Sequence, residues 1–174
     1  VPAAIGFSQA SGIPFELGII RNHYVGRTFI EPEQRIRQLG VKLKHSANRS
    51  VIRGNRVILI DDSVVRGTTS KKLVQMIFEA GAREVHMRIA SPPITHPDFY
   101  GIDTPRVKEL LAANMTIDQM REFMGATSLA FITVDGIYRA LGYDGRDARS
   151  PQMTDHCFTG DYPTRLLDQE GATS

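Results

Sequence analysis

The chain has 174 residues, a formal net charge of +2 and one cysteine. Its length suits a single ordinary domain, its interspersed acids and bases argue against a nucleic-acid-binding face, and no stretch approaches the ~18 apolar residues of a membrane-spanning helix. One cysteine excludes an intrachain disulfide framework and fits a reducing compartment, so we expect a soluble protein of the cytoplasm.

The first twenty residues predict a helix and then a strand. Small and apolar residues from Ala3 to Ala10 favour a helix, and Gly12 can supply the left-handed conformation that ends one. The alternation in residues 15–20 indicates a short strand. Because the chain begins at Val1, directly in this helical pattern and without an initiator methionine, we expect it to be a piece of a longer protein.

Residues 21–49 are rich in Arg and Lys and contain few consecutive apolar residues. Glu31 and Pro32 are typical of a helix start, because proline fits the first turn and acids favour the positive end of the helix dipole. That helix would end near Gly40. Two interpretations of the region stay open at this point: a solvated basic connection, or a lid whose cations neutralise a polyanionic substrate.

The most informative stretch begins with an apolar run at residues 57–60, Val-Ile-Leu-Ile. The run is too short for an ordinary helix and is typical of a buried parallel strand. It ends at two adjacent carboxylates, Asp61 and Asp62. A loop with glycine and hydroxyl residues follows, and apolar positions in residues 71–78 then favour a helix that lies on a sheet.

This order of strand, acidic pair, hydroxyl loop and helix is a phosphate-binding layout. The unpaired N–H groups and the positive dipole at a helix N-terminus attract phosphate, and residues 67–70 would form that cradle. Neither a Walker A pattern nor Gly-x-Gly-x-x-Gly occurs. The acids therefore need another partner, either sugar hydroxyls or a divalent cation, and a ribose with a 5-phosphate satisfies both halves. The alternative is that the acids only cap a helix and carry solvated charge.

The rest of the chain continues the alternation of helices and strands. Gly81 would end the helix after the phosphate loop, and residues 85–90 predict a strand that completes a parallel strand, helix, strand unit. Residues 91–101, rich in proline, predict a loop at the strand's carboxyl end, where ligands bind in open α/β sheets. The further expected elements are helices at 106–113 and 116–124, a strand at 129–134 and a helix at 135–141 capped by Asp135.

Several of these segments resemble one protein family. Residues 57–70 resemble the signature for phosphoribosyl pyrophosphate (PRPP) of the type I phosphoribosyltransferases. Residues 21–30 and 46–49 are similar to segments of the glutamine PRPP amidotransferases, which open purine biosynthesis, and the likeness extends to the tail segment 157–164.

The resemblance implies the type I phosphoribosyltransferase fold, an α/β fold with a mostly parallel sheet and flanking helices. Residues 1–150 would be a partial transferase domain that lacks its N-terminal portion, with a flexible loop at 21–49 and the PRPP motif at 57–70, and residues 151–174 would be an irregular C-terminal tail. The family pattern also places a glutaminase domain, with an N-terminal cysteine nucleophile, before Val1 and outside this chain.

The implied activity is that of an amidophosphoribosyltransferase, which is a glycosyltransferase. It converts PRPP and glutamine, or ammonia, into 5-phosphoribosylamine, pyrophosphate and glutamate in the first step of purine biosynthesis. In this interpretation ammonia comes from the glutaminase domain, Mg²⁺ is the cofactor, purine nucleotides are inhibitors and the protein is a homo-oligomer. Nucleic acid and membranes are not expected partners.

The resemblance also assigns roles to residues. The catalytic set would be Asp61, Asp62, Tyr24 and Arg27: the aspartates hold the ribose hydroxyls and Mg²⁺, and the loop around Tyr24 and Arg27 closes as a lid, which favours the lid interpretation of that region. The residues that would bind PRPP are Asp61, Asp62, Ser63, Val64, Arg66, Gly67, Thr68, Thr69, Ser70 and Lys44.

Many members of the resembled family hold a structural iron–sulfur cluster through four cysteines, and this sequence departs from that pattern. Asp98 stands at one cysteine position, and the tail's Cys-x-x-Cys survives only as Thr154 and Cys157. One thiolate cannot hold a four-iron cluster, so we expect no cluster and interpret Cys157 as a buried or idle thiol. A zinc site from His156 and Cys157 is not expected, because a partner pair of ligands is not evident.

Three other functions stay open. The chain could belong to another phosphoribosyltransferase with a nucleobase acceptor, although the long motif at 21–49 argues against it. It could be a PRPP-binding regulator that binds nucleic acid, although the near-neutral charge supplies no basic face. It could also be a fragment that folds but is inactive, because the pyrophosphate loop lies before Val1.

Overall fold

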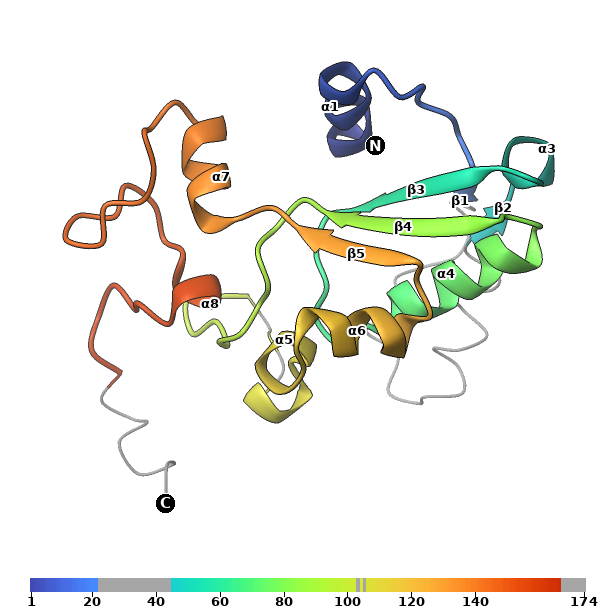
Figure 1. Ribbon diagram of the computed structural model, residues 1–174. Helices are drawn as coiled ribbons and strands as arrows, with labels where there is room; N and C mark the ends of the chain where they lie inside the picture. Colours follow the sequence, from blue (N-terminus) through green and yellow to red (C-terminus); the bar gives the residue numbers. More distant parts are fainter. Residues whose placement is uncertain (22–44, 103, 105, 167–174) are drawn as a thin grey trace.

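The computed structural model describes residues 1–21, 45–102, 104 and 106–166. At its centre, β3 (Arg56–Asp61), β4 (Glu84–Ile89) and β5 (Ser128–Phe131) form a parallel sheet in that order (Figure 1). The helix α4 (Thr68–Glu79) connects β3 to β4, α6 (Ile117–Met124) precedes β5, and both helices lie on one face of the sheet. The predicted α/β fold with a parallel strand, helix, strand unit is confirmed.

The pattern of β4 explains why the two helices lie on the same face. Val85, Met87 and Ile89 alternate along the strand and are all buried, whereas the polar residues between them are half-buried on the opposite face. Each fully buried apolar side chain of this size contributes about 1.5–3 kcal/mol. The core that forms around these three side chains includes Val64, Val74, Ile77, Leu111, Met120, Met124 and Leu129.

The remaining elements surround this unit. In Figure 1, α1 (Pro2–Ser11) lies above β3, away from α4 and α6. β1 (Ile19–Arg21) pairs antiparallel with β2 (His45–Ala47), and the short helix α3 (Arg49–Ile52) leads into β3. The other elements are η1 (Val107–Glu109), a 3₁₀ turn, and the helices α5 (Leu111–Asn114), α7 (Val134–Ala140) and α8 (His156–Thr159).

Local signals at helix ends are confirmed. The helix α1 ends at Gly12, whose φ of 72° is left-handed. At the start of α6, the Thr116 hydroxyl accepts from the backbone N–H of Gln119 at 3.3 Å, and the Gln119 side chain accepts from the backbone N–H of Thr116 at 2.8 Å. This reciprocal capping box satisfies two N–H groups that no helical carbonyl can reach.

Two predicted strands differ from the observed ones. The prediction that residues 57–60 are buried is wrong: they are half-buried, because β3 lies at the edge of the sheet in the described part of the chain. The strand predicted at 15–20 is confined to Ile19–Arg21. In the described part of the chain, its partner β2 offers three residues for pairing, and beyond them the Asn48 N–H still donates to the Gly18 carbonyl at 2.8 Å before α3 begins at Arg49.

Two predicted helices also differ. The helix predicted at 106–113 is split into η1 and α5 by Leu110, which is extended with φ −76° and ψ 116°. The cap predicted at Asp135 is wrong, because the hydroxyl of Thr133 caps α7 by accepting from the N–H of Gly136 at 2.9 Å. The carboxylate of Asp135 accepts instead from the backbone N–H of Arg146 at 3.0 Å.

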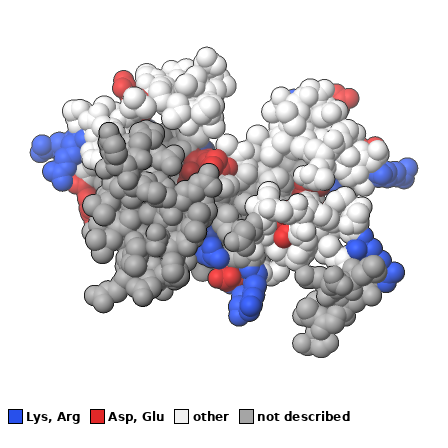
Figure 2. All heavy atoms as spheres, turned by 180° about the vertical axis from the view of Figure 1, so that it is seen from behind, with Lys and Arg blue, Asp and Glu red and all other residues white. Residues whose placement is uncertain are grey.

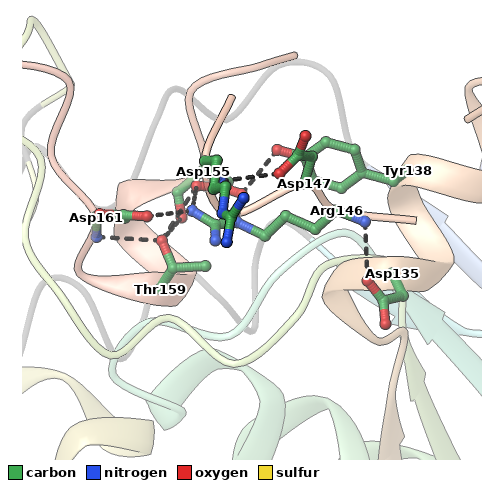
Figure 3. A network of polar contacts seen from close by, with 8 residues as sticks. Asp135, Tyr138, Arg146, Asp147, Asp155, Thr159 and Asp161 are labelled. Atoms are coloured by element: carbon green, nitrogen blue, oxygen red, sulfur yellow. Dashed lines mark hydrogen bonds and ion pairs between the residues drawn. The ribbon is translucent and has the colours of Figure 1, made fainter. Parts of the chain in front are cut away.

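A polar network ties the segment after α7 to α8 (Figure 3). The guanidinium of Arg146 donates to the buried carboxylate of Asp155 and, at 2.6 Å, to Asp161. The hydroxyl of Tyr138 on α7 donates to Asp155 at 2.8 Å. Burial alone would raise the pKa of Asp155, but these donors hold it below its usual value.

Among the described residues, none of the helices has the length and apolar character needed to cross a membrane.

The Arg146 to Asp155 pair is a testable stability determinant. Because Asp155 is buried, Arg146→Met should leave its charge uncompensated and lower the free energy of unfolding by about 3 kcal/mol. Chemical denaturation followed by circular dichroism measures the change. The control is Arg149→Met, which removes an exposed guanidinium nearby and should change stability by less than about 0.5 kcal/mol. Equal stability of the two variants would contradict the assigned role.

Candidate functional site

The acidic pair lies where β3 ends, at the carboxyl edge of the parallel sheet. Asp61 still pairs with β4 in register with Ile89, and its carbonyl accepts from the N–H of Ala90 at 2.9 Å. The carboxylate of Asp61 accepts from the N–H of Asp62 at 3.0 Å, and that of Asp62 accepts from the N–H of Ser63 at 2.8 Å. The backbone is therefore held up to the last residue of the strand and turns directly after it.

The two carboxylates have different surroundings. Asp61 is half-buried, whereas Asp62 is exposed. Burial raises the pKa of Asp61 from 3.8 to about 6, and the neighbouring charge of Asp62 adds to the rise. A cation or a set of hydroxyl donors placed beside Asp61 would favour its charged form and lower the pKa again. The half-buried Asp61 carboxylate is therefore a charge that a ligand at this edge of the sheet can stabilise.

The loop after the pair leads into α4. Gly67 precedes the helix with a φ of 70°, a left-handed conformation that favours glycine, and no side chain of the described residues caps the first turn. Thr68 and Thr69 are exposed and Ser70 is buried. The first amides of an α-helix have no intrahelical acceptor, so this N-terminus offers open donors to an anion. The structure therefore brings the predicted cradle to the same sheet edge as the acidic pair.

Other predicted site residues fall into three groups. The side chain of Val64 is buried in the core, so only its backbone could contact a ligand. The guanidinium of Arg66 is exposed and lies 3.5 Å from the carboxylate of Glu109 on η1. Tyr24, Arg27 and Lys44 lie outside the described residues, and so does most of the predicted lid at 21–49.

Two contacts to the loop were not predicted from the sequence. The backbone N–H of Leu111 donates to the carbonyl of Val65 at 2.8 Å, and the Leu111 side chain packs beside Gly67. Apolar periodicity places a leucine in the core but does not show which loop its amide meets. The charge of Glu109 was the one available signal for the pair with Arg66.

A second polar cluster joins the loop after β4 to the tail. The carboxylate of Asp98 accepts from Nε2 of His156 at 2.6 Å and from the N–H groups of Tyr100 and Ile102 at 3.0 and 2.7 Å. The Ile102 N–H is the main cause that holds the pKa of Asp98 below its usual value. Cys157 is only partly buried, and burial raises the pKa of its thiol.

This cluster brings three possible metal ligands together. One ligand atom each of Asp98, His156 and Cys157 lies within 4.8 Å of the others, so Asp98 supplies a partner that the sequence did not reveal. A structural zinc site usually has four protein ligands, and only these three come together in the described part of the chain. The Asp98 carboxylate is already satisfied by three hydrogen bonds, which favours a polar cross-link.

Relatives found by comparison with known proteins support the resemblance seen in the sequence. No protein-family profile matches the chain. The amidophosphoribosyltransferase of Rhizobium etli is 66% identical over 171 residues, which is 98% of this chain and 34% of that protein. That of Bacillus subtilis is 51% identical over 166 residues, which is 95% of this chain and 35% of that protein.

A solved structure gives the same answer for the fold. The glutamine PRPP amidotransferase of B. subtilis complexed with ADP and GMP matches with a TM-score of 0.81 at 50% identity, over 95% of this chain and 36% of that one. The chain spans about a third of the length of the curated relatives it matches. Over nearly its whole length it is related to the glutamine PRPP amidotransferases, and the resemblance found in the sequence is confirmed.

The raised pKa of Asp61 predicts a measurable titration. Because the folded state holds the Asp61 proton more tightly than the unfolded state, stability should fall as pH rises from 3.8 to about 6. NMR titration of the Asp61 carboxyl carbon should give a midpoint near 6. Asp61→Asn should remove this part of the pH dependence, and a midpoint at the ordinary value would contradict the assigned burial effect.

The Asp98 cluster predicts the opposite sign. A depressed pKa contributes stability above the unfolded pKa of 3.8, and that contribution is lost as pH falls through the folded value. At pH 7, Asp98→Asn should therefore lower the free energy of unfolding by about 2 kcal/mol, with a smaller difference in acid. Thermal unfolding at several pH values measures both. Asp144→Asn, at an exposed position, is the control and should show neither effect.

Proposed function

We propose that the protein containing this chain is an amidophosphoribosyltransferase that forms 5-phosphoribosylamine from PRPP, with ammonia released from glutamine. The observation that carries the proposal is the acidic pair at the end of β3, followed within one loop by the N-terminus of α4, which no side chain of the described residues caps. A sugar that bears a phosphate matches this pair of features. Two relatives named amidophosphoribosyltransferase, 66% and 51% identical, support the choice among phosphoribosyltransferases.

The roles follow from the chemistry of the leaving group. As pyrophosphate departs, the ribose carbon C1 develops positive charge, and the ribose must be held so that the nucleophile attacks from the opposite side. Asp61 and Asp62 would accept hydrogen bonds from the ribose hydroxyls. The amides and hydroxyls of residues 63–70 would hold the 5-phosphate, and Tyr24, Arg27 and Lys44 belong to the segment that we propose to cover PRPP.

Magnesium fits the donors that the acidic pair provides. Mg²⁺ prefers carboxylate oxygens and keeps several water ligands, and the exposed carboxylate of Asp62 leaves room for both. When bound, the ion would neutralise charge on the pyrophosphate. The raised pKa of Asp61 means that a proton competes for the same carboxylate in mild acid.

The setting of the enzyme is part of the proposal. We propose that the enzyme is a cytoplasmic homo-oligomer. We also propose that purine nucleotides inhibit its activity, because a related structure is a complex with ADP and GMP. On the described residues of the face drawn in Figure 2, Lys and Arg are scattered among Asp and Glu and do not gather into one patch, so this face gives no support to a nucleic-acid-binding regulator. A regulator of that kind would need a basic surface.

The test replaces both carboxylates without changing their size. In the full-length protein that contains this sequence, Asp61→Asn with Asp62→Asn should lower PRPP-dependent product formation by at least about 100-fold with ammonia as donor, because neutral amides lose the charged contacts to the ribose and the metal. Pyrophosphate release measures turnover. Asp118→Asn on the exposed part of α6 is the control.

Two further measurements separate the outcomes. Calorimetry with ribose 5-phosphate and Mg²⁺ on this chain alone shows whether it binds the sugar phosphate without the rest of the protein. Binding without turnover would identify an inactive fragment of the enzyme. Near-wild-type turnover of the double variant would show that the two aspartates do not have the proposed role.

A further inference from the structure

The segment formed by η1 and α5 supports residues 63–67, which we call the phosphate loop, from the side. Leu110 ends η1 and turns the chain so that α5 begins directly against residues 63–67, far from them in sequence. Leu111, the first residue of α5, is buried in the core together with Val64 of the loop. The loop is therefore held both by the sheet that precedes it and by a segment that follows β4.

The first contact is a backbone hydrogen bond. The N–H of Leu111 lies at the start of α5, where it has no intrahelical acceptor, and it donates to the carbonyl of Val65 at 2.8 Å. The peptide bond between Val65 and Arg66 is planar and trans, so its carbonyl and its N–H point in opposite directions. By fixing the carbonyl, Leu111 also fixes the direction of the Arg66 N–H.

The second contact is made by the side chain. A Cβ atom added to Gly67 would meet Cδ2 of Leu111 at 2.5 Å and Cε1 of Phe123 at 3.2 Å. Leu111 thus fills the space that the missing side chain leaves, beside the residue that begins α4. The ion pair between Arg66 and Glu109 is exposed and contributes little by itself.

We propose that Leu111 is a positioning residue for the phosphate loop: its amide orients the peptide between Val65 and Arg66, and its side chain holds Gly67 in the left-handed conformation that starts α4. Leu111 contacts the loop and not the ligand. This inference rests on the proposed function, because it concerns the affinity of that same loop for the 5-phosphate of the ribose.

The test removes the Leu111 N–H with little change to the backbone. Leu111→Pro suits this position, because proline is tolerated at the first residue of a helix and Leu110 already has the extended conformation that precedes proline. Losing one hydrogen bond worth about 1 kcal/mol should weaken ribose 5-phosphate binding about fivefold. The binding is measured by calorimetry with Mg²⁺ present.

Matched variants separate the amide from the side chain. Leu111→Ala keeps the N–H and removes the side-chain packing against Gly67 and the core. Val134→Pro places proline at the first residue of α7, the helix after β5, and should leave affinity unchanged. If Leu111→Pro does not fold, replacement of the Leu111 amide by an ester removes the same donor and keeps the leucine side chain.

The readouts distinguish the two proposals. If the wild-type chain and the full-length protein both fail to bind ribose 5-phosphate, the proposed function fails and the inference falls with it. If wild type binds and the folded proline or ester variant binds equally well, only the positioning role is overturned. The expected result is weaker binding with a shifted amide resonance of Arg66 in the free protein and, in the full-length protein, a higher KM for PRPP with a smaller change in kcat.

Discussion

The pairing of β3 with β4 is the constraint on which the site depends. In the described part of the chain β3 is at the sheet edge and only half-buried, so its position is set largely by β4, whose apolar face packs on α4 and α6. The pairing continues to Asp61, and the N–H of Ala90 holds the Asp61 carbonyl beyond the end of the ladder. The acidic pair is thus presented by rigid backbone, while burial of the Asp61 carboxyl group raises its pKa and leaves a charge for a ligand to stabilise.

The sequence predicts the elements whose signals are local. The alternation in β4 and the capping box at Thr116 each depend on neighbouring residues only, and both agree with the structure. The acidic pair and the hydroxyl loop are contiguous, so their placement between β3 and α4 was also predictable. The sequence signature at residues 57–70 does not show that Leu111 supports the loop, because Leu111 is far from it in the chain.

The errors have one physical origin, which is that tertiary partners decide the outcome. The strand predicted at 15–20 shortens because β2 is short, and the helix predicted at 106–113 breaks because the Leu111 amide bonds to Val65 in place of a helical carbonyl. The cap of α7 moves to Thr133 while Asp135 is used by the backbone of Arg146. Local propensity allows several secondary structures for a segment, and long-range contacts decide which of them forms.

The contact between Asp98 and His156 is also a long-range one, because it joins groups 58 residues apart. The resemblance implies that in many members of the family cysteines of this loop and of the tail share an iron–sulfur cluster, which would connect the two segments through metal–thiolate bonds. Here a carboxylate and an imidazole connect the same two segments through a hydrogen bond, and the backbone N–H groups of Thr95 and His96 donate to the carbonyl of Cys157 beside it. A thiolate link is sensitive to oxidation, whereas this link depends on the charge of Asp98, whose lowered pKa keeps it ionised well below neutral pH. The two chemistries can therefore hold the same loop, but they fail under different conditions.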